Sequence, residues 1–192
     1  MKIMSCVQFL GRQGLALRGN ESEEGNLSQL LKLRSDDDSV LFEWLNSRSH
    51  DYTSPKIQNE MLSIMANYIV RDIATEIRSQ PQLQYSIIID GTQDITGTEQ
   101  ESICLRYVDH DLIPHEVFVG LYEVSLTTGQ NLANVAKDVL LRLNLSLDGL
   151  RGQTYGAANM SGKYAGAQAY LRQAQPLALF IHCGPHCVNL IT

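Results

Sequence analysis

The chain has 192 residues, 44% of them hydrophobic and 19% charged, and its formal net charge is −6. These values exclude a disordered chain, and the length is enough to bury one substantial core. The 15 basic residues are scattered among 21 acidic ones, which argues against nucleic-acid binding by electrostatics alone. No apolar run approaches the roughly 20 residues of a membrane helix, and no signal peptide is evident. We therefore expect an intracellular protein without membrane contact.

The first third of the sequence predicts short helices followed by one long one. Residues 11–26 are rich in Gly, Asn, Glu and Ser, which indicates an irregular segment. Residues 27–33 and 39–46 predict two short helices, the second capped by Asp38 or Ser39. Residues 55–78 show the longest helical periodicity of the chain, which ends before a proline.

The long helix has a clear start and a long apolar stripe. Ser54 can cap it, and Pro55 can occupy its first position. The apolar positions are Ile57, Met61, Ile64, Met65, Tyr68, Ile69, Ile73 and Ile77. An exposed stripe of this length would form a patch typical of an interface. We therefore expect the face of Ile57, Met61, Ile64 and Tyr68 to dock on the domain.

The sequence after Pro81 has the character of a mixed sheet. Residues 85–90, 101–108 and 116–124 predict strands, and their short polar links predict antiparallel hairpins. The elements expected after them are a helix at 132–143 capped near Thr127 or Thr128, a strand at 150–154, a helix at 161–174 and a buried strand at 177–181. This order is that of an RNase H-like α/β core, although the pattern alone leaves it as one of several mixed folds.

Two parts are therefore expected. Residues 1–80 form an N-terminal helical segment, and residues 81–192 form a partial RNase H-like core. The sequence stops at Thr192 in what resembles the first turns of a further helix. We expect the domain to be truncated there.

Asp90 is the first candidate for chemistry. It ends an apolar strand, where a buried sheet meets solvent, and two-metal phosphoryl transfer needs carboxylates at such a place. The competing interpretation is an acid that caps the following turn through its side chain. Asp94 is a weaker candidate of the same kind.

Two other segments carry residues of chemical interest. Residues 156–163 resemble a phosphate loop, but five residues separate the glycines and Tyr164 follows Lys163, so the segment is not a Walker motif. A loop of small residues before a helix capped by Ser161 is the structural alternative.

The second of these segments, residues 182–187, holds two histidines and two cysteines. Zinc is one hypothesis and a buried polar turn is the other, because a closed zinc site usually draws on two separated ligand pairs. Cys183 and His186 are three residues apart and could share one helical face. A hydrolase using Cys183, His186 and Asp90 has no supporting motif. All four cysteines of the chain are expected to be reduced thiols.

Several segments, in order along the chain, together resemble one family. They are residues 9–19, 52–60, 90–95, 99–108, 150–155 and 156–162, then His182, Cys183, His186, Asn189 and Leu190. The chain resembles the hAT transposase-like domain of MYM-type zinc-finger proteins and related transposon-derived proteins. The resemblance covers nearly the whole chain.

The resemblance implies an RNase H-like core with three acids that bind Mg²⁺ or Mn²⁺. Asp90 matches the first acid. The second should follow the tyrosine of a Tyr-Asp-Gly-Ala-Asn-type turn, but Gly156 directly follows Tyr155 here. The third, a Glu, lies in the family beyond a helical region that this sequence lacks. Cys183 and His186 match a Cys-x-x-His feature that we interpret as structural or DNA-proximal.

We therefore expect an inactive fragment of a hAT transposase-derived domain, without a cofactor of its own. It could retain contacts with DNA, weakened by the acidic net charge, or with a protein partner, and the resemblance implies the nucleus. The alternative is an active metal-dependent transposase or nuclease that takes its other acids from Asp148, Glu123 or a partner chain.

Overall fold

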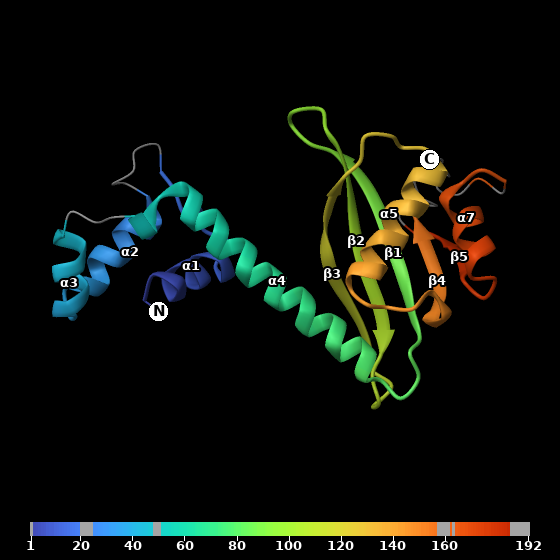
Figure 1. Cartoon of the computed structure of the whole chain (residues 1–192), viewed down its shortest axis with the longest axis horizontal. Coiled ribbons are helices and arrows are strands. Elements are labelled where there is room, and N and C mark those ends of the chain that lie inside the picture. Colours follow the sequence, from blue (N-terminus) through green and yellow to red (C-terminus); the bar gives the residue numbers. More distant parts are fainter. Residues whose placement is uncertain (1, 20–24, 48–50, 157–161, 163, 185–192) are drawn as a thin grey trace. The chain divides into compact units, whose positions relative to one another are not determined.

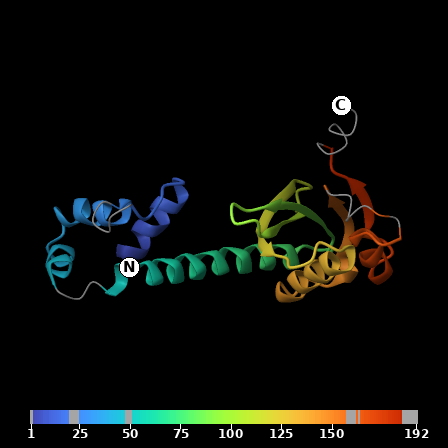
Figure 2. The same ribbon diagram turned by 90° about the horizontal axis from the view of Figure 1, so that it is seen from above.

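The computed structural model describes residues 2–19, 25–47, 51–156, 162 and 164–184 (Figures 1 and 2). The chain divides into two compact units, Met1–Ile69 and Val70–Thr192. The boundary between them lies inside one long helix, so each unit contains a part of it.

The first unit is helical. Its elements are α1 (Lys2–Arg12), α2 (Asn26–Ser35), α3 (Ser39–Asn46), the 3-10 turn η1 (Asp51–Thr53) and the first part of α4 (Pro55–Ser79). Helices α2 and α3 confirm the two predicted short helices. Helix α1 was not predicted, although its buried residues Cys6, Val7 and Leu10 lie at helical spacing.

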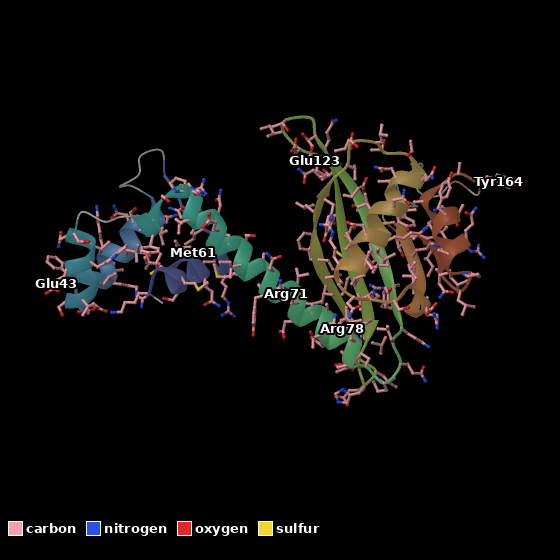
Figure 3. The ribbon with its side chains drawn as sticks, viewed as in Figure 1. Glu43, Met61, Arg71, Arg78, Glu123 and Tyr164 are labelled. Carbon is pink, nitrogen blue, oxygen red and sulfur yellow. The ribbon has the colours of Figure 1, made fainter. Side chains whose placement is uncertain are left out.

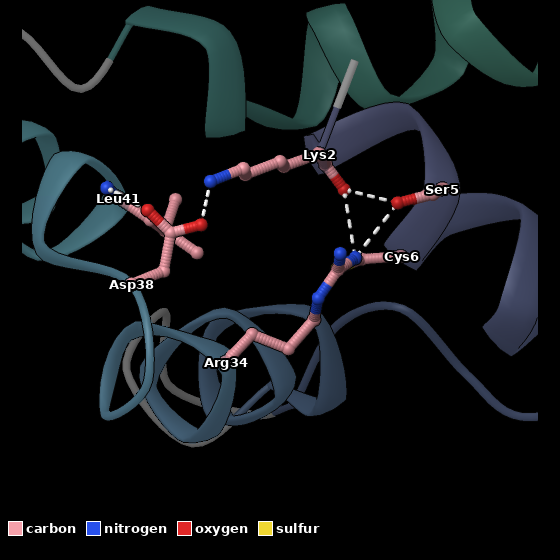
Figure 4. A network of polar contacts seen from close by, with 6 residues as sticks. All are labelled: Lys2, Ser5, Cys6, Arg34, Asp38 and Leu41. Atoms are coloured by element: carbon pink, nitrogen blue, oxygen red, sulfur yellow. Dashed lines mark hydrogen bonds and ion pairs between the residues drawn. The ribbon is translucent and has the colours of Figure 1, made fainter.

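Polar contacts join α1 to α2 and α3 beside the apolar core of this unit (Figure 4). Arg34 of α2 donates to the Ser5 hydroxyl at 2.7 Å and to the Lys2 carbonyl at 3.4 Å. Lys2 forms an ion pair with Asp38, whose carboxylate also caps α3 by accepting from the Leu41 amide at 3.0 Å. The buried core beneath them consists of Cys6, Val7, Leu10, Leu27, Leu31 and Leu41.

Helix α4 begins as predicted, with Pro55 first and the Ser54 hydroxyl accepting from the Ile57 amide at 3.4 Å. The expectation that its long apolar face docks was wrong, because Ile64 is 59% exposed and Tyr68 is 72% exposed. Burial is instead divided between the ends of the helix. Met61 and Met65 pack on the core of the first unit, and Ala74 and Ile77 are buried in the core of the second unit. The periodicity of apolar residues correctly predicted the helix. It did not reveal how many of these residues each of the two small cores can bury.

Neighbouring positions on α4 should therefore differ in how much a charged side chain destabilises the first unit. We expect Met65→Asp to destabilise the first unit by roughly 1–3 kcal/mol, because it places a carboxylate against an apolar core. Ile64→Asp should change the free energy of unfolding by less than about 0.5 kcal/mol, because its side chain is exposed. Urea unfolding followed by the fluorescence of Trp44, which lies in this unit, measures both. Equal losses for the two variants would contradict this division of α4.

The second unit contains a five-stranded mixed sheet with the order β3-β2-β1-β4-β5. Its strands are β1 (Tyr85–Gln93), β2 (Glu99–Val108), β3 (Pro114–Glu123), β4 (Leu150–Tyr155) and β5 (Leu179–His182). The predicted hairpins are confirmed, since β2 pairs antiparallel with both β1 and β3. Strands β4 and β5 continue the sheet in parallel with β1, so β1 is central.

Helices α5 (Gly129–Arg142) and α7 (Ala167–Ala174) lie on the same face of this sheet (Figures 1 and 2). Thr128 caps α5, its hydroxyl accepting from the Asn131 amide at 3.4 Å, as the sequence suggested. Helix α7 begins six residues later than predicted, and residues 157–161 and 163 lie outside the described part. A 3-10 turn, η2 (Leu147–Gly149), leads into β4.

Residues 177–181 were predicted to form a buried strand. A strand does form there, as β5, but most of its side chains are exposed. Leu179 and Ile181 are each 61% exposed. The reason is its position, because β5 is an edge strand and, among the described residues, α5 and α7 lie together on one face of the sheet. None of the helices in the described residues combines the length and the apolar character needed to cross a membrane.

Candidate functional site

The site is centred on the carboxyl end of the two parallel strands β1 and β4. Their pairing ends with Ile89 of β1 opposite Tyr155 of β4. Asp90 follows Ile89, and Gly156 follows Tyr155. A Cβ atom at position 156 would lie 2.7 Å from Asp90 Oδ1. Ligands of open α/β sheets commonly bind outside the carboxyl ends of such strands. The residue after Tyr155 is therefore the direct neighbour of the Asp90 carboxylate, and here it has no side chain.

Asp90 itself is exposed, but it does not end its strand as predicted. Strand β1 continues to Gln93, and these last residues pair only with β2, as far as Glu99. The extension exists because the β1–β2 hairpin has a well-bonded turn. Asp90 thus marks the end of the parallel pairing, not the end of β1.

Asp94 belongs to that turn. Its Oδ1 accepts from the amides of Thr96 at 2.8 Å and Thr98 at 2.9 Å, and its Oδ2 accepts from Gln100 at 3.2 Å. Hydrogen bonds from the Thr96 side chain and from these partners lower the pKa of Asp94. Asp94 therefore stabilises the turn, because both oxygens of its carboxylate already accept hydrogen bonds from residues of the turn and of β2.

Glu101 is a second carboxyl group at this end of the sheet, and sequence reasoning missed it. Its side chain is only 3% exposed and lies over Gly91, its partner in the pairing of β1 with β2. A Cβ atom at position 91 would lie 3.0 Å from Glu101 Oε1, so a larger residue there would require the Glu101 carboxyl group to shift slightly. Glu101 Oε2 has no hydrogen-bond partner among the described residues. Burial, then the negative charges of Asp90 and Glu99, raise the pKa of Glu101 to about 7.

Tyr155 closes the site on the β4 side without offering a reactive group. It is 1% exposed and stacks on Phe180, with ring centroids 6.0 Å apart. Burial raises the pKa of its phenol far above the usual value. Tyr155 is thus a core residue and unsuited to act as a base.

The other acids considered from the sequence lie away from Asp90. Asp148, in η2, is close enough to Tyr85 to raise the pKa of that phenol, secondary to burial, and Tyr85 begins β1. Five residues of strand, roughly 17 Å, separate that end from Asp90. Glu123 (labelled in Figure 3) ends β3 opposite Gln100, two strands away from β1. The structure brings neither acid to the Asp90 carboxylate.

The cysteine and histidine segment is only partly described. Cys183 directly follows β5 as a half-buried free thiol, and His182 packs edge-on against Phe180 at 4.6 Å between ring centroids. His186 and Cys187 lie outside the described residues, as does most of the loop at 157–163. Within the described ranges, no three His, Cys, Asp or Glu side chains lie close enough together to hold a metal ion. Cys6 and Cys104 are also free thiols.

One exposed carboxylate and one buried carboxyl group do not fit a two-metal centre. Mg²⁺ and Mn²⁺ favour several converging oxygen ligands, and two bridged ions need shared carboxylates. Among the described residues, Asp90 is the exposed acid at the open end of the parallel strands, and Glu101 beside it is buried. A single carboxylate whose remaining ligands are waters is a weak ligand for a hard cation.

The mixed sheet with helices on one face defines an RNase-like α/β domain. Residues 1–166 match the family DUF4371, described as the ZMYM1/FAM200 RNase-like domain. The chain belongs to this family, a transposon-derived domain found in MYM-type zinc-finger proteins. The predicted resemblance to the transposon-derived domain of MYM-type zinc-finger proteins is thereby confirmed.

Two curated relatives also match nearly the whole chain, each at 24% sequence identity. The "52 kDa repressor of the inhibitor of the protein kinase" of Homo sapiens is 24% identical over 200 residues, which cover 98% of this chain and 26% of the relative. The protein of the same name from Mus musculus is 24% identical over 199 residues, covering 97% and 26%. The chain therefore spans about a quarter of the length of these relatives.

Proposed function

We propose that this chain is a catalytically inactive hAT-type transposase-derived domain that binds partners rather than cutting DNA. The observation that carries the proposal is the Asp90–Gly156 pair. The position beside the first acid is the one where the resemblance places the second acid, and glycine occupies it. Residues 1–80 would serve as its helical segment and residues 81–192 as its RNase H-like core.

The chemistry of phosphoryl transfer explains why this loss would be decisive. Carboxylates hold the cations that neutralise charge on the attacking and leaving oxygens, and this electrostatic contribution is usually the largest in such catalysis. Asp90 alone cannot hold two cations, and Glu101 is buried in an environment that favours its protonated form.

The names of the relatives suggest a role through contacts. Both are described as repressors of an inhibitor of a protein kinase, which is a regulatory rather than a DNA-cutting description. We propose a protein or nucleic-acid partner for this chain on that basis, and a nuclear location because its family occurs in MYM-type zinc-finger proteins. The competing function is an active nuclease that borrows acids from a partner chain.

A cleavage assay separates these two functions. Purified chain is incubated with hAT terminal-repeat DNA and Mn²⁺, alongside Asp90→Ala. We expect no strand cleavage by either protein, because the second acid is absent. Cleavage by the native chain that disappears in Asp90→Ala would establish the nuclease and refute inactivity.

A further inference from the structure

Three arginines surround a pocket at the other end of the second unit. It lies between the last turns of α4 and the C-terminal end of α5 and has a volume of about 230 Å³. Arg71, Arg78 and Arg142 line it together with Ala74, Leu143 and Asn144. Figure 3 shows Arg71 and Arg78 on α4, two helical turns apart. Among these described lining residues none is acidic or aromatic.

Two of the three arginines have a structural partner. Arg78 donates to the Leu143 carbonyl at 2.5 Å, so it caps the end of α5, where the helix dipole favours a cation. Arg142 pairs with Asp138 at 2.7 Å, but both side chains are at least half exposed, and such pairs hold weakly. The Arg71 guanidinium forms no ion pair with any described residue. With Asp138 counted, the three arginines leave a local charge of +2 in a chain of net charge −6.

We propose that this arginine pocket binds phosphate groups of a nucleic-acid backbone. Guanidinium groups match the paired oxygens of phosphate, and a bound anion would relieve the mutual repulsion of the three cations. Without an aromatic ring for a base to stack on, contact is with the backbone and independent of base sequence. The choice of a polymeric ligand rests on the proposed function, whereas the affinity for phosphate does not.

The pocket is separate from the Asp90 site. Helix α4 leads into the start of β1, and the Tyr85 hydroxyl donates to the Ser146 carbonyl just beyond α5. Asp90 lies five residues further along β1, at the opposite end of the parallel strands. Nucleic acid held in the arginine pocket would therefore be anchored away from the position where cutting would occur.

The test compares a double variant of the pocket arginines with a control variant elsewhere on the second unit, both made in the full chain. Arg71→Gln/Arg142→Gln removes two pocket charges while sparing Arg78, which caps α5. The control is Arg106→Gln, since Arg106 pairs with Glu116 at 2.7 Å on the opposite face of the sheet and is likewise exposed. Fluorescence anisotropy with labelled duplex and single-stranded DNA over a salt series gives the affinities. Calorimetry with inorganic phosphate tests the pocket alone.

We expect the double variant to bind DNA at least about tenfold more weakly, with a salt dependence reduced by about one ion for each arginine. The Arg106→Gln chain should bind like the native chain. Unchanged binding by the double variant, or an equal loss in Arg106→Gln, would overturn the pocket. Phosphate binding without any DNA binding would overturn the assignment to a nucleic-acid backbone. Cleavage that requires Asp90 would refute the proposed inactivity and leave the pocket standing.

Discussion

Replacing Glu101 with Gln should stabilise the second unit by roughly 2–3 kcal/mol at pH 8 and hardly at all at pH 4. The carboxyl group is buried, one of its oxygens lacks a partner among the described residues, and its pKa is raised to about 7. Gln has nearly the shape of the protonated acid and carries no charge. The substitution therefore removes the cost of burying a carboxylate.

The direction of the pH dependence follows from the raised pKa. In the unfolded chain Glu101 ionises near its ordinary value of 4.5, whereas in the folded chain it ionises at about 7. The native chain is thus free of this cost below about pH 4.5 and loses stability as the pH rises to about 7. Above that pH the loss is complete and constant.

Urea unfolding followed by circular dichroism at several pH values measures this effect, because the single tryptophan lies in the first unit. Glu123→Gln is the matched control, since Glu123 is an exposed glutamate at the end of β3. The control should leave the stability within about 0.5 kcal/mol of the native value at every pH. An advantage of Glu101→Gln that is the same at pH 4 and pH 8 would show that ionisation is not its cause.

Gly156→Asp should increase the affinity for Mn²⁺ at least about tenfold. It places a second carboxylate beside Asp90, and two converging carboxylates hold a hard cation better than one. Without metal the variant should be less stable than the native chain, because the new Cβ comes within 2.7 Å of Asp90 Oδ1 and two like charges meet. Saturating Mn²⁺ should restore stability, since a ligand that binds only the folded state stabilises it.

Gly156→Asn is the control for this substitution. It adds a side chain of the same size without a charge, so it should show the steric loss but little gain in Mn²⁺ affinity. Calorimetric titration and thermal unfolding with and without Mn²⁺ provide the two readouts. Equal affinities for the Asp and Asn variants would mean that position 156 does not share a cation with Asp90. Full strand cleavage is not expected from Gly156→Asp, because the substitution supplies one further carboxylate and two bridged metal ions need several.

Much of the sheet could be predicted because its signals are local. The β-branched run before Asp90 and the alternating segments after it determine strands, and their short links determine hairpins. The burial of Glu101 could also have been predicted, because it alternates along β2 with the buried residues Ile103, Leu105 and Tyr107. The raised pKa of Glu101 could not be predicted, because it depends partly on Asp90 of the neighbouring strand.

Features that depend on distant parts of the chain escaped sequence reasoning. The exposure of Ile64 and Tyr68 depends on how much of α4 each core covers, which periodicity does not reveal. The contact of Gly156 with Asp90 depends on the register of two strands 65 residues apart. The arginine pocket likewise joins Arg142 to residues that precede it by more than 60 positions.

The most direct test of a single-acid site is the number of Mn²⁺ ions that the native chain binds. Electron paramagnetic resonance during a Mn²⁺ titration counts bound ions and detects two ions close enough to couple. We predict weak binding of isolated ions without a coupled pair, and the loss of the ion held by Asp90 in Asp90→Ala. A coupled Mn²⁺ pair in the native chain that disappears in Asp90→Ala would contradict the account.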